Sequence, residues 1–463
     1  MKRKYLSLLL AVVMLVTCMP ACGGAGTEDS STEQTAGSGE KILRVATQDP
    51  QVPLDMQLNT YSNIMKVTDN ITESLLTTNS DGSLEPTLLT GMPTLSDDKL
   101  TYSFELKDGV KFHNGAVLTS NDVKYSLERL VKKLKMASLM DKVEGYDAFF
   151  NGEADEMTGI EIVDDTHFNI HMSEVYTPFL SVLSTPYCAI YPAEACEAAG
   201  DSWGMTELYG TGPFMLKSYQ TGVGVELVKN PDWHNGDVKL DGIKYTFIDD
   251  SNTGLLEYQK GNIDVVYMDA SLYPTYANSD IKDEIHTFEP FGGYYMSFNV
   301  KDIPEVKVRE AITYAIDREK IVTEQTGGFA AAAVLPCSPN APFYDVRLAN
   351  SFSYSTARFY EQLESASVED MDGDGVLDLY VTSLGYAVPV SGTMLVCSSS
   401  YQRVLAASEI VDALNALGFD LTLKTVDSTE FKQALALGNF DLYYGEVRMS
   451  ANFDLSPFFR YGG

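Results

Sequence analysis

Hydrophobic and polar residues alternate with a period of two between residues 100 and 106. The apolar positions there are Leu100, Tyr102, Phe104 and Leu106. Because successive side chains of a strand point to opposite faces, this alternation predicts a strand with one buried face. KILRVATQDP, residues 41–50, is also expected to form a strand that ends at its proline. After residue 106, the Asp108-Gly109 turn leads into VKFHNG, residues 110–115, which we expect to be a short strand.

Two other stretches have the spacing of an amphipathic helix. Thr119, followed three residues later by Asp122, has the pattern of a capping box, so a helix is expected to begin here. The apolar face of this helix would carry Val123, Leu127, Leu130, Val131 and Leu134. VKVREAITYAIDREKIV, residues 306–322, has a similar apolar stripe, and we expect one helix over its length.

One short pattern occurs twice. QKGNIDVVY begins at Gln259 and ALGNFDLYY begins at Ala436. Each has the composition of a helix end, a glycine and then a short apolar strand. The repeat predicts two α/β lobes rather than one, and a cleft between lobes is a common place for a ligand.

The N-terminus has the features of an export signal. Residues 2–4 are basic, and the apolar run 6–16 is shorter than the about 20 residues that span a bilayer. We therefore expect a signal peptide over residues 1–21. Cys22, after Met19-Pro20-Ala21, matches the bacterial lipobox, and we expect it to receive lipid and become the mature N-terminus. The alternative is secretion without a lipid anchor. A metal site at Cys18 and Cys22 is not expected, because two soft ligands are too few for one.

Residues 22–41 contain no large apolar side chain, so we expect a lipid anchor followed by a flexible tether. The rest of the 463-residue chain is hydrophobic enough, at 44% of the whole, to build two or three domains. The formal net charge of −32 argues against nucleic acid and anionic lipid headgroups as partners. The acidic residues are spread along the chain, which favours a role in solubility.

The sequence contains no strong catalytic signature. GxSxG, HExxH and P-loop motifs are absent from it, and the pair His167 and His171 is a weak basis for a metal site. We therefore expect no catalytic residue, no metal and no cofactor. The cysteines beyond the N-terminus leave two alternatives, disulfides between sequence neighbours or buried free thiols. The neighbour pairs would be Cys188–Cys196 and Cys337–Cys397.

The segment 370–378 resembles the start of an EF-hand loop. Aspartates occupy the first, third, fifth and ninth positions, but Val381 stands at the twelfth, where a bidentate glutamate is needed. We expect an acidic turn that does not require calcium, built on the backbone preferences of Asp and Gly.

Four long blocks resemble the family 5 extracellular solute-binding proteins of ABC importers, the oligopeptide, dipeptide and nickel group. The blocks are residues 84–130, 210–220, 230–250 and 297–322. The resemblance implies an α/β, two-lobed, periplasmic-binding-protein-like fold of the large three-domain type. It places domain I at residues 42–76 and 209–290, domain II at 77–208 and domain III at 291–463. It also implies a chain truncated at its C-terminus, because the family's return segment to domain I would be absent.

The resemblance also suggests where a ligand would bind. Peptide-binding members of the family hold the peptide N-terminus with an acidic residue in the segment that matches 443–459, but the nearest equivalents here are Met449 and Ser450. Glu446 and Asp454 are nearby acidic candidates. Positive charges that suit a ligand carboxylate are Arg403 and Arg448. An ion pair within the chain is the structural alternative for each of these charged residues.

Several uncharged residues complete this set of candidates. Asn299 would line the cleft or serve as a strand-end amide. Aromatic walls that tolerate different side chains would come from Tyr294, Tyr295 and Tyr401.

We expect a substrate-binding lipoprotein that captures short peptides or a similar small solute and delivers it to the permease subunits of an ABC importer. It would be a monomer held by its lipid anchor on the outer face of the cytoplasmic membrane. The alternatives are a secreted carboxylate-type hydrolase, whose paired carboxylates leave no sequence motif, and a solute sensor on the same fold.

Overall fold

The computed structural model describes residues 40–59, 62–79, 82–133, 136–268, 272–287, 292–326, 329–337, 344–381 and 384–448. The expected signal peptide, Cys22 and most of the expected tether lie outside these residues, as do Leu134 and Asp454. None of the helices in the described ranges has both the length and the apolar character that a bilayer crossing requires.

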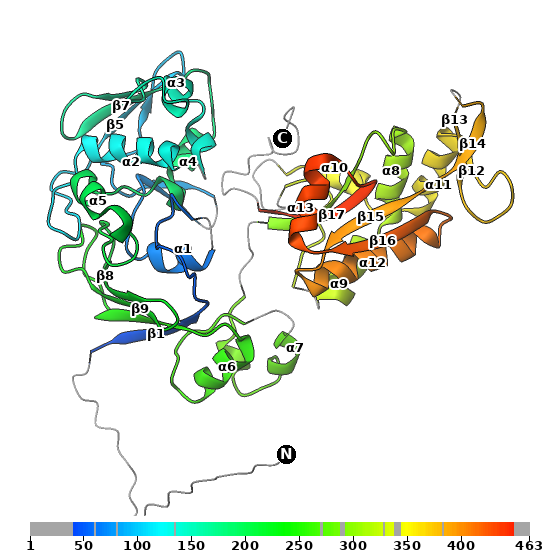
Figure 1. Ribbon diagram of the computed structural model, residues 1–463. Helices are drawn as coiled ribbons and strands as arrows, with labels where there is room; N and C mark the ends of the chain where they lie inside the picture. Colours follow the sequence, from blue (N-terminus) through cyan, green and yellow to red (C-terminus); the bar gives the residue numbers. More distant parts are fainter. Residues whose placement is uncertain are drawn as a thin grey trace, which may run out of the picture. The chain divides into compact units, whose positions relative to one another are not determined.

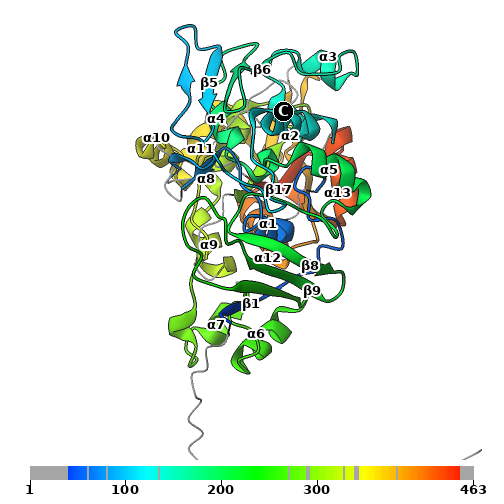
Figure 2. The same ribbon diagram turned by 90° about the vertical axis from the view of Figure 1, so that its left-hand side faces the viewer.

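The first sheet has the strand order β1-β10-β9-β8. Its strands are β1 (Ile42–Thr47), β8 (Phe214–Gln220), β9 (Gly224–Lys229) and β10 (Gly242–Phe247). β1 and β10 are parallel and the other pairs are antiparallel, and β8 lies beside β9 in both views (Figures 1 and 2). The strand expected near residue 42 is thereby confirmed. The helices of this part are α1 (Ser62–Thr68), α6 (Ser251–Gln259) and α7 (Tyr273–Tyr276).

A second sheet has the order β4-β5-β7-β6, and β2 pairs with β3 beside it. These strands are β2 (Leu76–Thr78), β3 (Leu84–Pro86), β4 (Thr94–Leu95), β5 (Thr101–Glu105), β6 (Ile160–Ile162) and β7 (His167–His171). The helices are α2 (Ser120–Lys132), α3 (Tyr146–Phe150), α4 (Phe179–Leu183) and α5 (Ala193–Ala199). Short 3₁₀ turns occur at Ala137–Met140, Pro186–Cys188, Gly200–Ser202 and Lys282–Glu284.

The local patterns around β5 and α2 are mostly confirmed. Tyr102 and Phe104 of β5 are buried in the core, as the alternation predicts. The Asp122 carboxylate accepts hydrogen bonds from the backbone N–H and the hydroxyl of Thr119, both at 2.9 Å, so the expected cap begins α2. The expected strand at residues 110–115 is wrong, because this segment makes only an isolated bridge, Lys111 with Val117, around a tight turn.

A buried ion pair joins α2 to the segment after β1. Arg129 of α2 donates from Nη2 to Oδ2 of Asp55 at 2.6 Å, and from Nη1 to the Gln57 amide oxygen at 2.7 Å. The Asp55 side chain has no exposed surface and Arg129 is 8% exposed. The two charges are therefore compensated within the chain rather than by water.

The third sheet has the order β11-β17-β15-β16. Its strands are β11 (Gly292–Phe298), β15 (Ser391–Cys397), β16 (Asp420–Val426) and β17 (Leu442–Arg448). β15, β16 and β17 are parallel, and the connecting helices α12 (Tyr401–Asn415) and α13 (Ser428–Leu437) lie on opposite sides of the sheet (Figure 1). Right-handed crossovers in opposite directions along a sheet require this placement.

The single helix expected over residues 306–322 is wrong. The chain forms α8 (Val306–Ala315) and α9 (Arg318–Thr326), separated by an extended Ile316 with φ −94° and ψ 113°. Ile316 is buried, and Asp317 begins α9 by accepting a hydrogen bond from the Lys320 N–H at 3.0 Å. A buried side chain and a new N-cap thus replace the continuation of the helix.

The remaining elements adjoin the third sheet in sequence. They are α10 (Val346–Ser351), α11 (Thr356–Ser365) and a small antiparallel sheet of β12 (Val368–Glu369), β13 (Asp378–Val381) and β14 (Tyr386–Pro389). The acidic segment 370–378 connects β12 to β13.

The repeated Gly-Asn-X-Asp pattern occupies equivalent places in the first and third sheets. Gly261 and Gly438 follow helices α6 and α13 with φ of 74° and 69°. Asp264 then accepts the backbone N–H of Arg44 in β1 at 2.8 Å, and Asp441 accepts that of Thr393 in β15 at 2.7 Å. The second copy continues into β17, whereas the first makes only an isolated parallel bridge between Val265 and β1.

The four cysteines of the described residues are free thiols, so the disulfide alternative is wrong. Cys188 is packed in the core around β5 and β7, while Cys196 belongs to the core below the first sheet. Burial raises the pKa of the Cys188 thiol to about 12. Cys337 and Cys397 are also buried, so the alternative of buried free thiols holds.

Candidate functional site

Three of the sequence candidates meet at the carboxyl end of the third sheet. Arg403 stands in the first turn of α12, directly after β15, where Ser400 caps the helix. Its Nη2 donates to Oε2 of Glu446 in β17 at 2.5 Å. Its guanidinium lies 5.1 Å from the ring centroid of Tyr294, which is paired with Glu446 across β11 and β17. We call Arg403, Glu446 and Tyr294 the strand-end cluster.

The strand-end cluster combines a buried cation with a partly exposed anion. The Arg403 side chain is 8% exposed and that of Glu446 is 42% exposed. Among the described residues, Nε of Arg403 has no hydrogen-bond partner although it is buried. The pair fits the structural alternative for both residues, and the Glu446 side chain remains partly exposed.

The other aromatic candidates lie elsewhere. Tyr295 points to the opposite side of β11 from Tyr294, where its hydroxyl contacts that of Tyr443 at 2.7 Å. Tyr401 is 72% exposed, at the first position of α12. Arg448 ends β17, but its side chain lies outside the described set, as do Asp454, Met449 and Ser450.

Asn299 follows β11 and is hydrogen-bonded on every side. Its Nδ2 donates to the carbonyl oxygens of Gly438 and Phe440, at 3.2 and 3.0 Å, and to the Asp302 carboxylate. Its Oδ1 accepts the Lys301 N–H at 3.1 Å. These are the contacts of a strand-end amide, which is the structural alternative for this residue.

A pocket of about 230 Å³ at the carboxyl end of β1 was not predicted from the sequence. We call it the β1 pocket. Polar and aromatic residues that line it include Thr47, Asn63, Lys66, Asp249, Asp250 and Tyr267. The carboxyl ends of parallel strands are the usual place for ligands in open α/β sheets. The signal that could have indicated it is the parallel pair β1 and β10, but those strands are about two hundred residues apart.

Lys66 is the cation of the β1 pocket. Its Nζ lies 3.3 Å from the ring centroid of Tyr267, and partial burial lowers the pKa of its ammonium group. Within the described ranges, no carboxylate lies within ion-pair distance of this ammonium. Thr47 is 5% exposed, and its hydroxyl has no hydrogen-bond partner in the same ranges.

A second polar group that the sequence did not predict surrounds Glu73. This carboxylate accepts hydrogen bonds from Nε2 of His234 and the hydroxyl of Thr211, both at 2.7 Å, and from Nε1 of Trp233 at 3.2 Å. The side chains of Glu73 and His234 are 11% and 9% exposed. With so little solvent access, the group ties together distant segments of the chain rather than presenting a surface.

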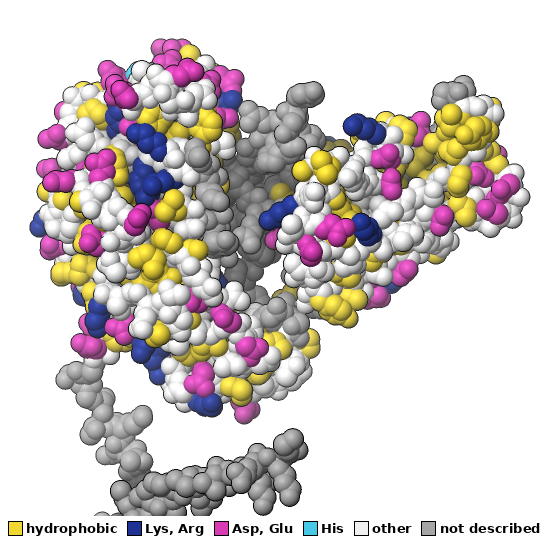
Figure 3. Space-filling model, in the orientation of Figure 1, with side chains coloured by type: hydrophobic (Ala, Val, Ile, Leu, Met, Phe, Trp, Pro, Cys, Tyr) yellow, Lys and Arg dark blue, Asp and Glu magenta, His cyan; other side chains and the backbone are white. Residues whose placement is uncertain are grey.

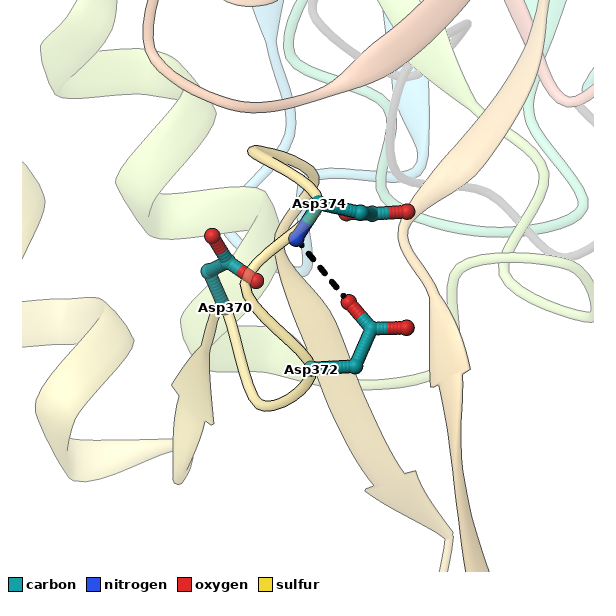
Figure 4. A group of neighbouring side chains, drawn as sticks. All are labelled: Asp370, Asp372 and Asp374. Carbon is teal, nitrogen blue, oxygen red and sulfur yellow. Dashed lines mark hydrogen bonds between the residues drawn. The ribbon is translucent and has the colours of Figure 1, made fainter.

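The acidic segment places Asp370, Asp372 and Asp374 on one turn, with carboxylate oxygens within 4.8 Å of one another (Figure 4). All three are exposed, and their carboxylates accept backbone N–H groups of the same turn, for example Gly373 on Asp370 at 2.6 Å. Three carboxylates at this spacing could hold a cation, and the hydrogen bonds are those of the expected acidic turn.

The two histidines of β7 contact separate carboxylates. Nδ1 of His167 lies 2.9 Å from Asp164, and Nε2 of His171 lies 3.1 Å from Glu161.

Acidic side chains are scattered over the face seen in Figure 3 rather than gathered in one block. This matches the even spread of acidic residues along the sequence.

Comparison with known proteins identifies the family. The sequence model of the bacterial extracellular solute-binding proteins, family 5 (middle region), matches residues 83–462. The oligopeptide-binding protein OppA of Bacillus subtilis is 24% identical over 399 residues, which cover 83% of this chain and 72% of OppA. The oligopeptide-binding protein AppA of the same organism is 26% identical over 396 residues, or 82% of this chain and 69% of AppA.

Solved structures confirm the expected fold. The unliganded open form of the periplasmic murein tripeptide-binding protein MppA superposes with a TM-score of 0.70 at 20% identity, covering 90% of this chain and 82% of MppA. NikA from Brucella suis, in complex with Fe(III)-EDTA, gives the same TM-score and identity over 90% of this chain and 81% of NikA. The architecture is thus that of the α/β periplasmic binding proteins. The chain belongs to the family 5 bacterial extracellular solute-binding proteins.

Proposed function

We propose that the protein is the substrate-binding lipoprotein of an ABC importer and that its solute is a short peptide. The observation that carries this proposal is the family match over residues 83–462. The names of the relatives support the choice of solute, because OppA and AppA are described as oligopeptide-binding proteins. The AppA structure contains a nonapeptide and shares the fold with a TM-score of 0.62.

The strand-end cluster is our candidate for contact with the peptide. Arg403 is held by Glu446 and Tyr294 at the carboxyl end of parallel strands, which is where such sheets bind ligands. A guanidinium whose Nε–H has no hydrogen-bond partner among the described residues suits a peptide carboxylate. Glu446 is exposed enough to meet a peptide ammonium group. Arg448 and Asp454 remain further candidates from the same segment.

The remaining parts of the proposal concern organisation and delivery. Cys22 would carry the lipid, and residues 22–41 would tether the folded part to the outer face of the cytoplasmic membrane. Domain I would comprise residues 42–76 and 209–290, domain II residues 77–208 and domain III residues 291–463. A monomer would close on its peptide because the ligand adds contacts only in the closed state, and the permease subunits would then receive it.

Peptide binding can be tested directly. The full chain is purified without denaturation, and mass spectrometry identifies small molecules that are retained with it. Calorimetry with the identified compound, or with synthetic peptides of two to five residues, then measures affinity. Saturable binding with no turnover supports the proposal. Hydrolysis of the bound compound would favour the secreted-hydrolase alternative, and retention of a non-peptide solute would correct the solute class.

A further inference from the structure

Lys66 is a partly buried cation that lines the β1 pocket. Its ammonium group lies against the ring of Tyr267, and among the described residues it has no ion-pair partner. A partly buried cation loses hydration that an anion would replace. The observation points to an anionic group that comes from outside the chain.

The Thr47 hydroxyl provides a second, independent indication in the same pocket. It belongs to a residue that is 95% buried, and it makes no hydrogen bond within the described part of the chain. A buried hydroxyl without a partner costs roughly 1–3 kcal/mol, so such groups are normally satisfied. A ligand oxygen in the β1 pocket would satisfy it.

We propose that the β1 pocket is a subsite that binds a carboxylate group of the solute between the Lys66 ammonium group and the Thr47 hydroxyl. The inference rests on the proposed function, since it names the part of the peptide that this pocket would take. A volume of about 230 Å³ is smaller than the roughly 300–1,000 Å³ of pockets that enclose whole ligands. The pocket therefore fits one end or one side chain of a peptide.

The acidic residues of the pocket define the solute further. Asp250 caps α6 by accepting the backbone N–H and the hydroxyl of Thr253, at 2.8 and 2.7 Å, which holds its pKa below the usual value. Oδ1 of Asp249 accepts a long hydrogen bond, from the Asp49 N–H at 3.4 Å. Two negative charges beside one positive charge disfavour a simple anion and favour a solute that also carries an ammonium group, as a peptide does.

The test compares matched peptides on the full-length protein. Tripeptide mixtures with free C-termini are offered with the same mixtures in C-terminally amidated form, and peptides with an internal Glu are offered with their Gln counterparts. Retained peptides are quantified by mass spectrometry and one retained pair is measured by calorimetry. The variants are Lys66→Met, Thr47→Val and, as a control with the same charge change on exposed β10, Lys244→Met.

We expect the wild type to prefer the carboxylate form by about 10- to 100-fold, as for a charge-assisted hydrogen bond. Lys66→Met should abolish this preference, Thr47→Val should reduce it by about 2- to 10-fold, and Lys244→Met should preserve it. A preference for the free C-terminus would assign the bound carboxylate to the peptide main chain. A preference for Glu over Gln would assign it to a side chain. Equal retention of both forms by the wild type, or a preference that survives Lys66→Met, would overturn the proposal.

Failure of the peptide proposal is distinguishable from failure of the subsite. If the wild type retains no peptide, the pocket is probed with acetate alone, and the rate at which an amine-reactive ester acylates Lys66 is followed by mass spectrometry. Saturable protection of Lys66, without protection of Lys244, supports a carboxylate subsite for another solute. Absence of protection would refute the subsite.

Discussion

Replacing Arg129 by methionine should destabilise the protein far more than the loss of one ion pair at the protein surface would. The substitution keeps most of the apolar stem but leaves the Asp55 carboxylate, which has no exposed surface, without a cation. Asp55 would retain only the Gln57 N–H at 3.0 Å and a Tyr191 hydroxyl at 3.5 Å. Removing one partner of a buried pair costs about 3–5 kcal/mol.

The assay is equilibrium unfolding in urea, followed by tryptophan fluorescence and circular dichroism, with the free energy of unfolding taken from the linear extrapolation. Lys124→Met is a control on the same helix, since Lys124 pairs with a Glu156 side chain that is 63% exposed. It should cost less than about 1 kcal/mol. The double variant Arg129→Met with Asp55→Leu should regain most of the lost stability, because it leaves no uncompensated charge.

A loss of less than about 1 kcal/mol in Arg129→Met, equal to that of the Lys124 variant, would refute this reasoning. It would mean that water or a rearranged side chain compensates Asp55 as well as the guanidinium does. A double variant that is less stable than Arg129→Met alone would show that Asp55 contributes through its other hydrogen bonds instead.

Three further outcomes are expected. Cys22→Ala should abolish lipid attachment, so that the protein is left uncleaved or is shed into the medium; an unchanged membrane fraction with an unchanged N-terminal mass would contradict this. Chelator should leave the melting temperature unchanged because residues 370–378 need no calcium; a rise of several degrees with added calcium, lost in Asp372→Ala, would prove the opposite. Arg403→Ala should weaken peptide binding by about 1.5–3 kcal/mol in calorimetry if the guanidinium contacts a ligand carboxylate, and unchanged affinity would remove it from the site.

Local chemistry made some elements predictable. The alternation in β5 and the Thr119–Asp122 cap depend on residues that are close together in the sequence, so the sequence alone indicates them. The break between α8 and α9 depends on tertiary packing, because Ile316 leaves the helix to enter the core without any Gly or Pro. Asp317 was the available signal, since it is a good N-cap for α9.

The two candidate sites also differ in how far the sequence indicated them. Arg403 and Glu446 lie 43 residues apart; the family resemblance indicated the segment of Glu446, and the charge of Arg403 made it a candidate for a ligand carboxylate. The β1 pocket brings Lys66 of α1 beside Tyr267, although about 200 residues separate the two in the sequence. No local pattern connects these residues, because the pocket exists only once β1 has paired with β10.

That pairing also sets an order of events during folding. Ile42 of β1 pairs with Gly242 of β10, whereas Ser391 of β15 pairs with Asp420 of β16, so the two parallel pairs close loops of very different length. The scaling of loop-closure entropy makes the longer closure costlier by about 1.7 kcal/mol. β1 must therefore wait for β10, made about 200 residues later, whereas β15 can pair with β16 soon after both are made.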